Sequence, residues 1–536
     1  MNISILVADS LHINQRNFGS FFKFTERVKP TKLHFEDSHK DWIALYGVYD
    51  SKLAALYSKI EILSKCSKDE LLAFKVNDIP LFSVCRAEVL TLAATHKIWY
   101  DNPYPTNTKD IFEKLHTHNH TTLLQNMAAA WYWIEFWKTR LAELGNFTHC
   151  CVFSGGLIYQ KALIEQLKYT SVRVMVMESL FTGNEYYCEE RYSPIANNCD
   201  IKNPAVYKSY IKALETDDAY DKERMKAINK MLMMKNKNVE QPSSSDSLIF
   251  SDPDRPLVSI IGQVVNDFSV LEYKNNGIST IAFYKELIEK LASAGFNVAI
   301  KTHPWEEKKN NLKHPLTKTV LTEFVATLPL ELQQRIQVID HYAIKKLFEQ
   351  SKWIVGLNSQ GLIEAAFEGF KPVQFGNAFY GKRSFTHDYA LNDIDGFIQD
   401  LLTDKLNHIL TLSEWDKFEQ FITILLQKHA VSVHNSGILN LQKIFELPTY
   451  IPLVDIKPVA KKPNAPSNPS ESEVVSRPVS KVPAALMVQN ENMIRDGNSR
   501  SSAKWRKFKN TPHLFFADAK NPVLRPLKHF FKRSRS

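Results

Sequence analysis

The second half of the chain alternates short apolar runs with amphipathic segments, and this alternation constrains the fold more than any other feature. From Leu257 onward the apolar runs are LVSIIGQ, FNVAIKTHP, IQVIDHY, KWIVGLNS and KPVQFG, with helical patterns such as ISTIAFYKELIEKLASAG between them. Strands that alternate with helices build a parallel sheet covered by helices. The pattern predicts a doubly wound, Rossmann-like α/β domain, to which we assign residues 252–450.

The first half repeats this pattern less regularly. We expect buried strands at ISILVAD, THCCVF and SVRVMVMES, and a long aromatic-rich core helix over residues 121–144. These elements predict a first Rossmann-like domain over residues 1–240, with the polar stretch 221–247 as a linker or an excursion between domains. Two such domains place a ligand cleft between them, at the carboxyl ends of the strands.

Composition changes beyond the second domain. The 536 residues exceed what one hydrophobic core normally organises. Seven prolines lie between positions 451 and 483, among polar residues, and predict a disordered linker over 451–503. Residues 504–536 interleave basic and aromatic side chains. We expect this tail to bind an anionic membrane surface; the alternatives are a solvated basic tail that only aids solubility and docking onto a partner enzyme.

Charge and cysteine content narrow the function classes. From Arg500 to the end, eleven Lys or Arg face one acid, a net +10, while the whole chain carries +9. The body is therefore nearly neutral, and we expect no nucleic-acid partner. The six cysteines are scattered and contain no CxxC pair, which is typical of a protein in a reducing compartment. The sequence has no apolar run of roughly 18 to 20 residues and no basic start before an apolar run, so it predicts neither a membrane span nor a signal peptide. We therefore expect a cytoplasmic protein, peripheral on the inner membrane.

Polar residues that follow the strands of the second domain are the candidate site. In a doubly wound sheet such residues project at the ligand edge. A helix start beside a hydroxyl group suits a phosphate, which would then lie near His303 and Ser359. Local alternatives are a turn for Asp267, a hydrogen-bonded loop for His303 and N-capping by Asn358 or Ser359. The candidates are Gln263, Asp267, Ser269, His303, Pro304, Asn358, Ser359, Gln360 and Gly361.

A carboxylate in the first half adds a second kind of candidate. Glu178 ends the apolar run SVRVMVMES. It either caps a loop or, if the two strand ends face each other across the cleft, forms a carboxylate pair with Asp267. Paired carboxylates in a sugar cleft can divide nucleophilic and acid/base roles.

The ordered series GQVVNDFSV, KTHPWEE and GLNSQGLIEAAFEGFKPVQFGNAFYG resembles the bacterial capsule polysaccharide biosynthesis family, which includes retaining β-Kdo glycosyltransferases. VFSGGLIYQKALIE and ESLFTGNEYYCEERYSPIAN extend the resemblance over about residues 140–390. The basic-aromatic ending with HLFFADAKNP is similar to the tails of many capsule glycosyltransferases. One departure concerns the donor: relatives commonly have two small hydroxyl residues where this chain has Asn358 and Ser359.

The resemblance implies a GT-B-like enzyme that holds CMP-β-Kdo in its second domain and a glycan or glycolipid acceptor on the side of its first. It makes Asp267 the catalytic Asp, His303 the histidine of the HP nucleotide motif, Ser359 the donor-binding serine and Glu178 a cleft carboxylate. The sugar carboxylate of Kdo would pair with Lys301 or Arg383, unless these are surface charges.

Two further expectations concern the need for a metal and the identity of the donor. A CMP-sugar carries one phosphodiester, which a histidine and backbone amides can stabilise, so we expect neither a cofactor nor a metal. The acidic triplets Asp252–Asp254 and Asp393–Asp395 are then turn or helix-start residues. The rivals are a transferase that uses CMP-sialic acid or a UDP-sugar, and a non-catalytic glycan-binding subunit of capsule assembly.

Overall fold

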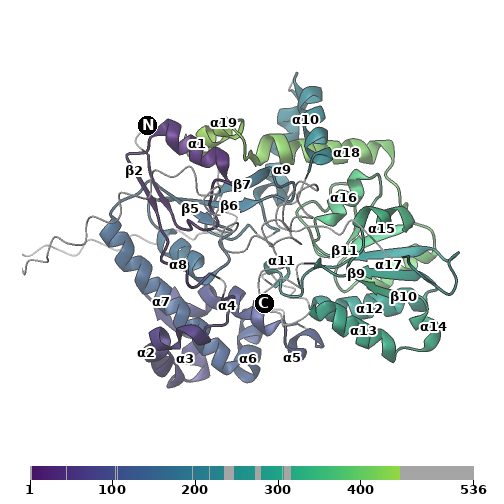
Figure 1. Cartoon of the computed structure of the whole chain (residues 1–536), viewed down its shortest axis with the longest axis horizontal. Coiled ribbons are helices and arrows are strands. Elements are labelled where there is room, and N and C mark those ends of the chain that lie inside the picture. The colour runs from purple at the N-terminus through teal and green to yellow at the C-terminus, as the bar shows by residue number, and fades with distance from the viewer. Residues whose placement is uncertain are drawn as a thin grey trace, which may run out of the picture. The chain divides into compact units, whose positions relative to one another are not determined.

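Two six-stranded sheets follow one another along the chain (Figure 1). This computed structural model describes residues 3–446 except 44, 103, 106, 196, 217, 235–246, 272–278, 305 and 307–314. Both sheets belong to one compact unit, Met1–Ile456. The predicted linker 451–503 and tail 504–536 lie outside the described residues. The expectation of an α/β fold with parallel sheets is confirmed.

The second sheet is parallel throughout and reverses its strand order at its centre. Its order β10-β9-β8-β11-β12-β13 corresponds to 3-2-1-4-5-6 along the chain, the order of doubly wound nucleotide-binding sheets. Ligands of such sheets bind where the order reverses, here between β8 and β11. The strands are β8 (Leu257–Ile261), β9 (Asn297–Lys301), β10 (Ile336–Ile339), β11 (Trp353–Gly356), β12 (Val373–Gln374) and β13 (His387–Asp388).

Helices cover both faces of this sheet, which explains why its central strands are apolar on both sides. Every residue of β8, β9 and β11 is buried. One face packs against α15 (Ile344–Gln350) and α16 (Gly361–Phe367) (Figure 1). The other packs against α12 (Thr280–Ser293), α13 (Leu316–Thr327) and α17 (Ile394–Leu402), with α11 (Phe268–Leu271) and α14 (Leu330–Gln333) as short connections.

The first sheet is mixed. Its order is β14-β7-β6-β5-β1-β2, in which β2, β1, β5 and β6 are parallel and β7 and β14 each run antiparallel to their inner neighbour. The three strands expected in this half are present. The strands are β1 (Ser4–Val7), β2 (Lys32–Phe35), β5 (His149–Phe153), β6 (Arg173–Ser179), β7 (Glu185–Glu190) and β14 (Val431–Ser432), and β3 (Lys75–Val76) pairs separately with β4 (Ile79–Pro80).

The aromatic-rich segment forms α7 (His120–Leu144), and the expectation of a core helix is confirmed. Trp133 and Trp137 are fully buried, and the indole N–H of Trp137 donates to the backbone oxygen of Tyr159 at 2.7 Å. The other helical segments up to residue 167 are α1 (Gly19–Val28), η1 (Asp50–Lys52), α2 (Leu53–Ser64), α3 (Lys68–Ala73), α4 (Leu81–Ala93), α5 (Lys97–Tyr100), α6 (Thr108–His118) and α8 (Ile158–Leu167).

The polar stretch 221–247, expected to be a linker or an excursion between domains, is helical in its first part. After η2 (Asp200–Lys202) and α9 (Pro204–Glu215), α10 spans Tyr220–Leu232. This helix packs on α18 (Leu412–Thr423), where Arg224 pairs with Glu419 at 2.7 Å. Its charged residues find partners distant in sequence, so local polarity alone misidentified it.

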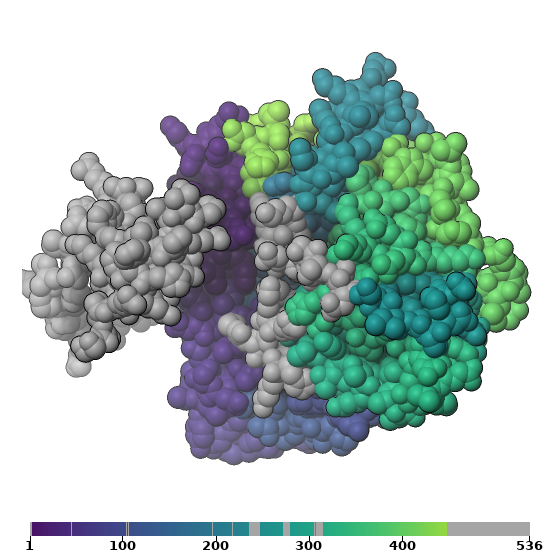
Figure 2. Space-filling model, turned by 45° about the vertical axis from the view of Figure 1, so that its right-hand side comes forward, coloured from purple at the N-terminus to yellow at the C-terminus, as the bar shows by residue number. Residues whose placement is uncertain are grey.

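The last described residues return to the first sheet, so the assignment of all of 252–450 to a second domain is wrong at its end. After α18 and η4 (Ile424–His429), β14 pairs with β7, and α19 (Gly437–Glu446) packs on α1. The ring centroids of Phe24 and Phe445 are 4.9 Å apart. In Figure 2 the yellow-green surface of this segment lies beside the purple N-terminal residues.

Candidate active site

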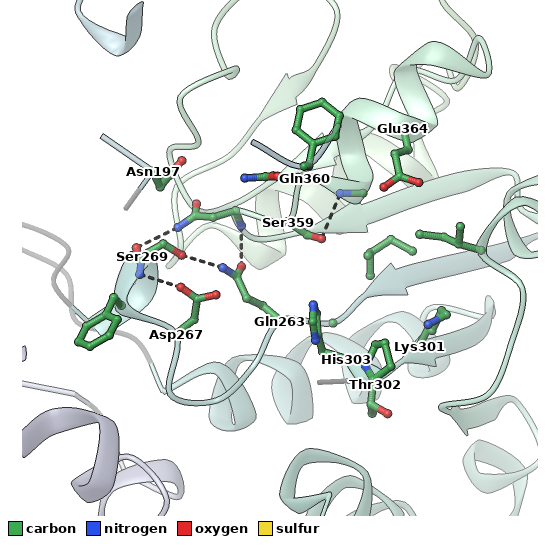
Figure 3. Close-up of a pocket in the computed structure, with 18 of the residues that line it drawn as sticks. Asn197, Gln263, Asp267, Ser269, Lys301, Thr302, His303, Ser359, Gln360 and Glu364 are labelled. Carbon is green, nitrogen blue, oxygen red and sulfur yellow. Dashed lines mark hydrogen bonds between the residues drawn. The ribbon is translucent and has the colours of Figure 1, made fainter. Parts of the chain in front are cut away.

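A cavity of about 280 Å³ lies where the second sheet reverses its order, and residues of the first half complete its wall (Figure 3). All eleven predicted site residues line it: Glu178, Gln263, Asp267, Ser269, Lys301, His303, Pro304, Asn358, Ser359, Gln360 and Gly361. The parallel register explains this convergence, because the residues after β8, β9 and β11 emerge at one sheet edge. Their chemical roles stay predictions.

Gln263 connects three elements at this edge. Its side-chain N–H donates to Ser269 Oγ at 2.8 Å, and its Oε1 accepts from the backbone N–H of Asn358 at 3.0 Å. The side-chain amide of Asn358 in turn donates from its Nδ2 to the backbone oxygen of Ser269 at 3.2 Å. These three residues were expected to contact the ligand. The structure shows that they also hold one another and so fix the shape of the cavity.

Asp267 both caps a short helix and lines the cavity. Its Oδ1 accepts from the backbone N–H of Ser269 at 2.8 Å, which caps the short helix α11. The same residue lines the cavity, to which Glu178 contributes from the end of β6. The turn expected as an alternative for Asp267 therefore coexists with a place in the cavity. The two carboxylates come from different halves of the chain and line one space.

The end of β9 lies close to the end of β8. The backbone N–H of Gly262 donates to the oxygen of Lys301 at 2.8 Å, and a Cβ on Gly262 would come within 2.7 Å of that oxygen. Glycine is therefore required here. The side chain of Lys301 is only 3% exposed, and burial lowers its pKa to about 8 against the opposing charges of Asp340 and Glu364. His303, two residues further on, also lines the cavity.

The start of α16 forms another wall. Ser359 Oγ accepts from the backbone N–H of Gly361 at 3.3 Å, and the hydroxyl of Tyr380 donates to the backbone oxygen of Ser359 at 2.6 Å. The N-capping expected as an alternative is thus present, and Ser359 still lines the cavity. One turn on, burial raises the pKa of Glu364 to about 7, although the charges of Lys345 and Lys301 oppose the shift.

Sequence reasoning missed several lining residues. Glu364 follows Gly361 by three positions, and helical spacing from that glycine could have indicated it. Asn197 lies in a loop without a strand-end signal, and its Oδ1 accepts from the backbone N–H of Phe379 at 2.9 Å, a bond between the two halves. The other missed residues are Ser154, Phe181, Ile261, Gly262, Phe268, Thr302, Ile344 and Phe379.

Arg383 does not line the cavity, and its proposed pairing with a sugar carboxylate is wrong for this structure. Its guanidinium lies 3.5 Å from the ring centroid of Tyr207 and donates to the backbone oxygen of Ile201 at 2.6 Å. Arg383 therefore ties the second half to the first.

The acidic triplets also lie away from the cavity. Asp252 accepts from Arg255 at 2.9 Å, and Asp395 at the start of α17 pairs with Lys290 at 2.7 Å. Among the described residues no three His, Cys, Asp or Glu side chains cluster as metal ligands. The expectation of a metal-free site stays a prediction. Within the same ranges, no helix has both the length and the apolarity to cross a bilayer.

The strand order and the polar cavity at its reversal define the class of doubly wound α/β proteins that bind ligands at strand ends. Residues 184–396 match the family described as capsule polysaccharide biosynthesis protein. The resemblance drawn from the sequence is confirmed over that range, while residues 140–183 lie outside it. A search of curated proteins finds no match.

Solved structures similar to this chain include two of KpsC from Thermosulfurimonas dismutans. The β-Kdo 2,4 transferase is 15% identical with a TM-score of 0.32, over 52% of this chain and 79% of that one. The β-Kdo 2,7 transferase is 16% identical with a TM-score of 0.31, over 58% and 90%. The glycosyltransferase SnogD from Streptomyces nogalater is 9% identical with a TM-score of 0.25, over 82% and 99%.

Proposed function

We propose that this chain is a glycosyltransferase of capsular or related surface-polysaccharide synthesis, which transfers β-Kdo from CMP-β-Kdo to a glycan or glycolipid acceptor with retention. The observation that carries the proposal is the convergence of the eleven predicted site residues on one cavity at the reversal point of the second sheet. The match to the capsule polysaccharide biosynthesis family, over a range that contains ten of them, supports the same conclusion.

Retention from a β donor requires two displacements. In the first, a carboxylate oxygen of Asp267 attacks the anomeric carbon, and CMP leaves with the electron pair of the broken C–O bond. In the second, the acceptor hydroxyl attacks the same carbon from the opposite side and releases Asp267. Glu178 takes the proton of that hydroxyl as general base.

The leaving phosphate needs positive or hydrogen-bonding groups where its charge develops. His303 and the hydroxyl of Ser359 line the middle of the cavity and supply them in this proposal (Figure 3). Neither group needs a bridging cation for a single phosphodiester, so the proposed reaction is metal-independent. Equal rates with EDTA and with Mg²⁺ would support this point.

The C-terminal tail brings the enzyme to its acceptor in this proposal. The eleven Lys and Arg after position 499 lie among aromatic residues, a composition that suits an anionic inner-membrane surface. The Pro-rich residues 451–503 give a tether between that surface and the catalytic body. The proposed location is therefore the cytoplasmic side of the inner membrane.

A donor panel tests the reaction. Release of CMP or UDP is measured with CMP-Kdo, CMP-sialic acid and UDP-sugars, first with water and then with acceptor extract. Faster turnover of CMP-Kdo than of the other donors supports the proposal. Faster turnover of another donor would replace Kdo as the proposed sugar. Binding of CMP-Kdo without transfer to any extract would favour the non-catalytic glycan-binding subunit.

A further inference from the structure

The first sheet also reverses its strand order, and a residue beside this reversal belongs to the cavity wall. In the parallel part of the sheet, β6-β5-β1-β2, the chain passes from β1 to β2 on one side of β1 and returns to β5 on the other. Ligands of doubly wound sheets bind at the carboxyl ends of the strands beside such a reversal. Ser154 follows β5 directly and lines the cavity. The first half therefore adds a strand-end position of its own to the site.

Ser154 has a strained backbone. Its φ is +53°, in the left-handed region that few side chains adopt. The backbone N–H of Gly155 donates to the backbone oxygen of Phe153 at 2.5 Å, which closes a three-residue turn around Ser154. A γ-turn with a positive φ at its centre is rare and strained. Glycine would adopt this conformation at no steric cost, so the turn does not explain why a serine side chain is present.

The hydroxyl group of Ser154 is not used to hold the fold. Within the described residues, no hydrogen bond involves its Oγ, and the side chain is half-buried at the cavity wall. The other two serines beside the cavity differ, because Ser269 and Ser359 each accept a hydrogen bond at Oγ. Strained backbone is found preferentially at functional sites. The combination of strain, an unused hydroxyl and a place in the cavity indicates that Ser154 contacts a ligand.

Glu178 is the neighbour of Ser154 on the adjacent strand. β5 and β6 are parallel with Phe153 opposite Met177, so Ser154 and Glu178 are the next two residues in register. The backbone N–H of Ser154 donates to the backbone oxygen of Met177 at 2.9 Å, so the pairing continues to this point. Neighbouring strands lie about 4.8 Å apart. Since both residues line the cavity, one oxygen atom of a ligand can contact both side chains.

We propose that Ser154 binds and orients the acceptor hydroxyl for the second displacement. The oxygen of that hydroxyl has two lone pairs. One lone pair forms the new bond to the anomeric carbon and displaces Asp267, the other accepts a hydrogen bond from Ser154 Oγ, and the proton passes to Glu178. Ser154 keeps its own proton throughout. This assignment rests on the proposed function and gives its acceptor side a specific residue of the first half.

Variants of Ser154 separate the two displacements. Ser154→Ala removes the hydroxyl and keeps the backbone strain, whereas Ser154→Gly removes both. The full chain is mixed with CMP-Kdo, first alone and then with a lipid extract of bacterial envelopes that is titrated by volume. The intact mass of the protein measures the sugar bound to Asp267, and CMP release measures turnover. Both variants should form the sugar adduct at the parent's rate, and their rate with the extract should fall about tenfold.

Ser384 provides the matched control, because it also has a positive φ, of +74°, but is exposed and does not line the cavity. Ser384→Ala and Ser384→Gly should transfer sugar at the parent's rate. Relief of strain is a separate readout: the urea midpoint of unfolding should rise in both glycine variants and in neither alanine variant. If Ser154→Gly gains stability and transfers sugar as fast as the parent, the serine has no role in the reaction and the proposal is overturned.

The first displacement also separates this proposal from the proposed donor. If another donor of the panel forms the adduct in the parent, the comparison is made with that donor, and a loss confined to the extract reaction upholds Ser154 while Kdo is replaced. If Ser154→Ala slows adduct formation as much as transfer, the assignment to the acceptor is overturned. If the folded parent neither releases a nucleotide from any donor nor transfers a sugar, the proposed function and this inference are both overturned.

Discussion

The side-chain oxygen of Gln263 accepts a hydrogen bond from the backbone N–H of Asn358 at 3.0 Å, and this bond joins the carboxyl ends of β8 and β11. Both residues are almost fully buried. These two strands flank the point at which the second sheet reverses its order. The bond therefore extends the pairing of β8 and β11 into the loops that follow them, where the cavity opens.

Replacement of Gln263 should loosen the site. Gln263→Leu leaves the backbone N–H of Asn358 buried without an acceptor, which should lower the free energy of unfolding by about 1 to 3 kcal/mol. The affinity for CMP should fall with it, because Ser269 also loses its bond from Gln263. Urea unfolding and calorimetry measure both. The exposed control Gln399→Leu should change neither, and unaltered stability of Gln263→Leu would show that the bond is dispensable.

Asp267→Asn should abolish transfer and preserve the fold. The amide oxygen can still accept from the N–H of Ser269, so the cap of α11 persists, whereas the nucleophilic charge is lost. The rate should fall more than about a thousandfold, a barrier increase of at least 4 kcal/mol. CMP binding should stay close to that of the parent. Asp254→Asn, in an exposed turn, serves as the control, and near-normal turnover of Asp267→Asn would exclude Asp267 from the mechanism.

His303→Ala should weaken nucleotide binding, because the histidine is assigned to the phosphate. Loss of one hydrogen bond to a charged group should raise the dissociation constant of CMP about tenfold or more. Binding of cytidine, which lacks the phosphate, should change little. The exposed His341 follows β10 and provides the control substitution His341→Ala. If His303→Ala binds CMP as tightly as the parent, the HP motif is only a structural loop.

Nucleotide affinity should depend on pH through Glu364 and Lys301. Burial raises the pKa of Glu364 to about 7 and lowers the pKa of Lys301 to about 8. Both side chains line the cavity, so a nucleotide that contacts their charged forms should bind less tightly below pH 7, as Glu364 gains a proton, and above pH 8, as Lys301 loses one.

The phosphate of CMP itself titrates near pH 6, so the informative quantity is the ratio of parent to Glu364→Gln affinity. This ratio should fall toward one as the pH drops from about 8 to about 5. Calorimetry across that range measures it. A ratio that does not vary with pH would separate Glu364 from the binding of the nucleotide.

Deletion of residues 504–536 should release the protein from anionic vesicles. The deletion removes ten Lys and Arg, each of which contributes about 1 kcal/mol near an anionic surface. Activity on a short soluble acceptor should stay nearly intact, since the catalytic body is retained. Co-sedimentation with phosphatidylserine vesicles, compared with neutral phosphatidylcholine vesicles, measures the effect. Unchanged sedimentation after the deletion would direct attention to a protein partner.

The sequence alone determined the central strands and helices of the second half and the strand-end residues of the site. A buried parallel strand must be apolar on both faces, so β8, β9 and β11 are visible as short apolar runs. Their polar ends, from Gln263 to Gly361, follow directly. Because parallel strands end at one edge, a local pattern was enough to bring together residues almost a hundred positions apart.

Only the tertiary structure decided the remainder. The two-residue strand β14 carries no periodic signal, and its place beside β7 depends on a pairing between Ser432 and Glu185. Asn197 and Arg383 have positions set by contacts between the two halves, which no local pattern encodes. Glu364 looks like any helical glutamate in the sequence. Its character comes from burial and from the absence of a partner among the described side chains, and both are properties of neighbours that only folding assembles.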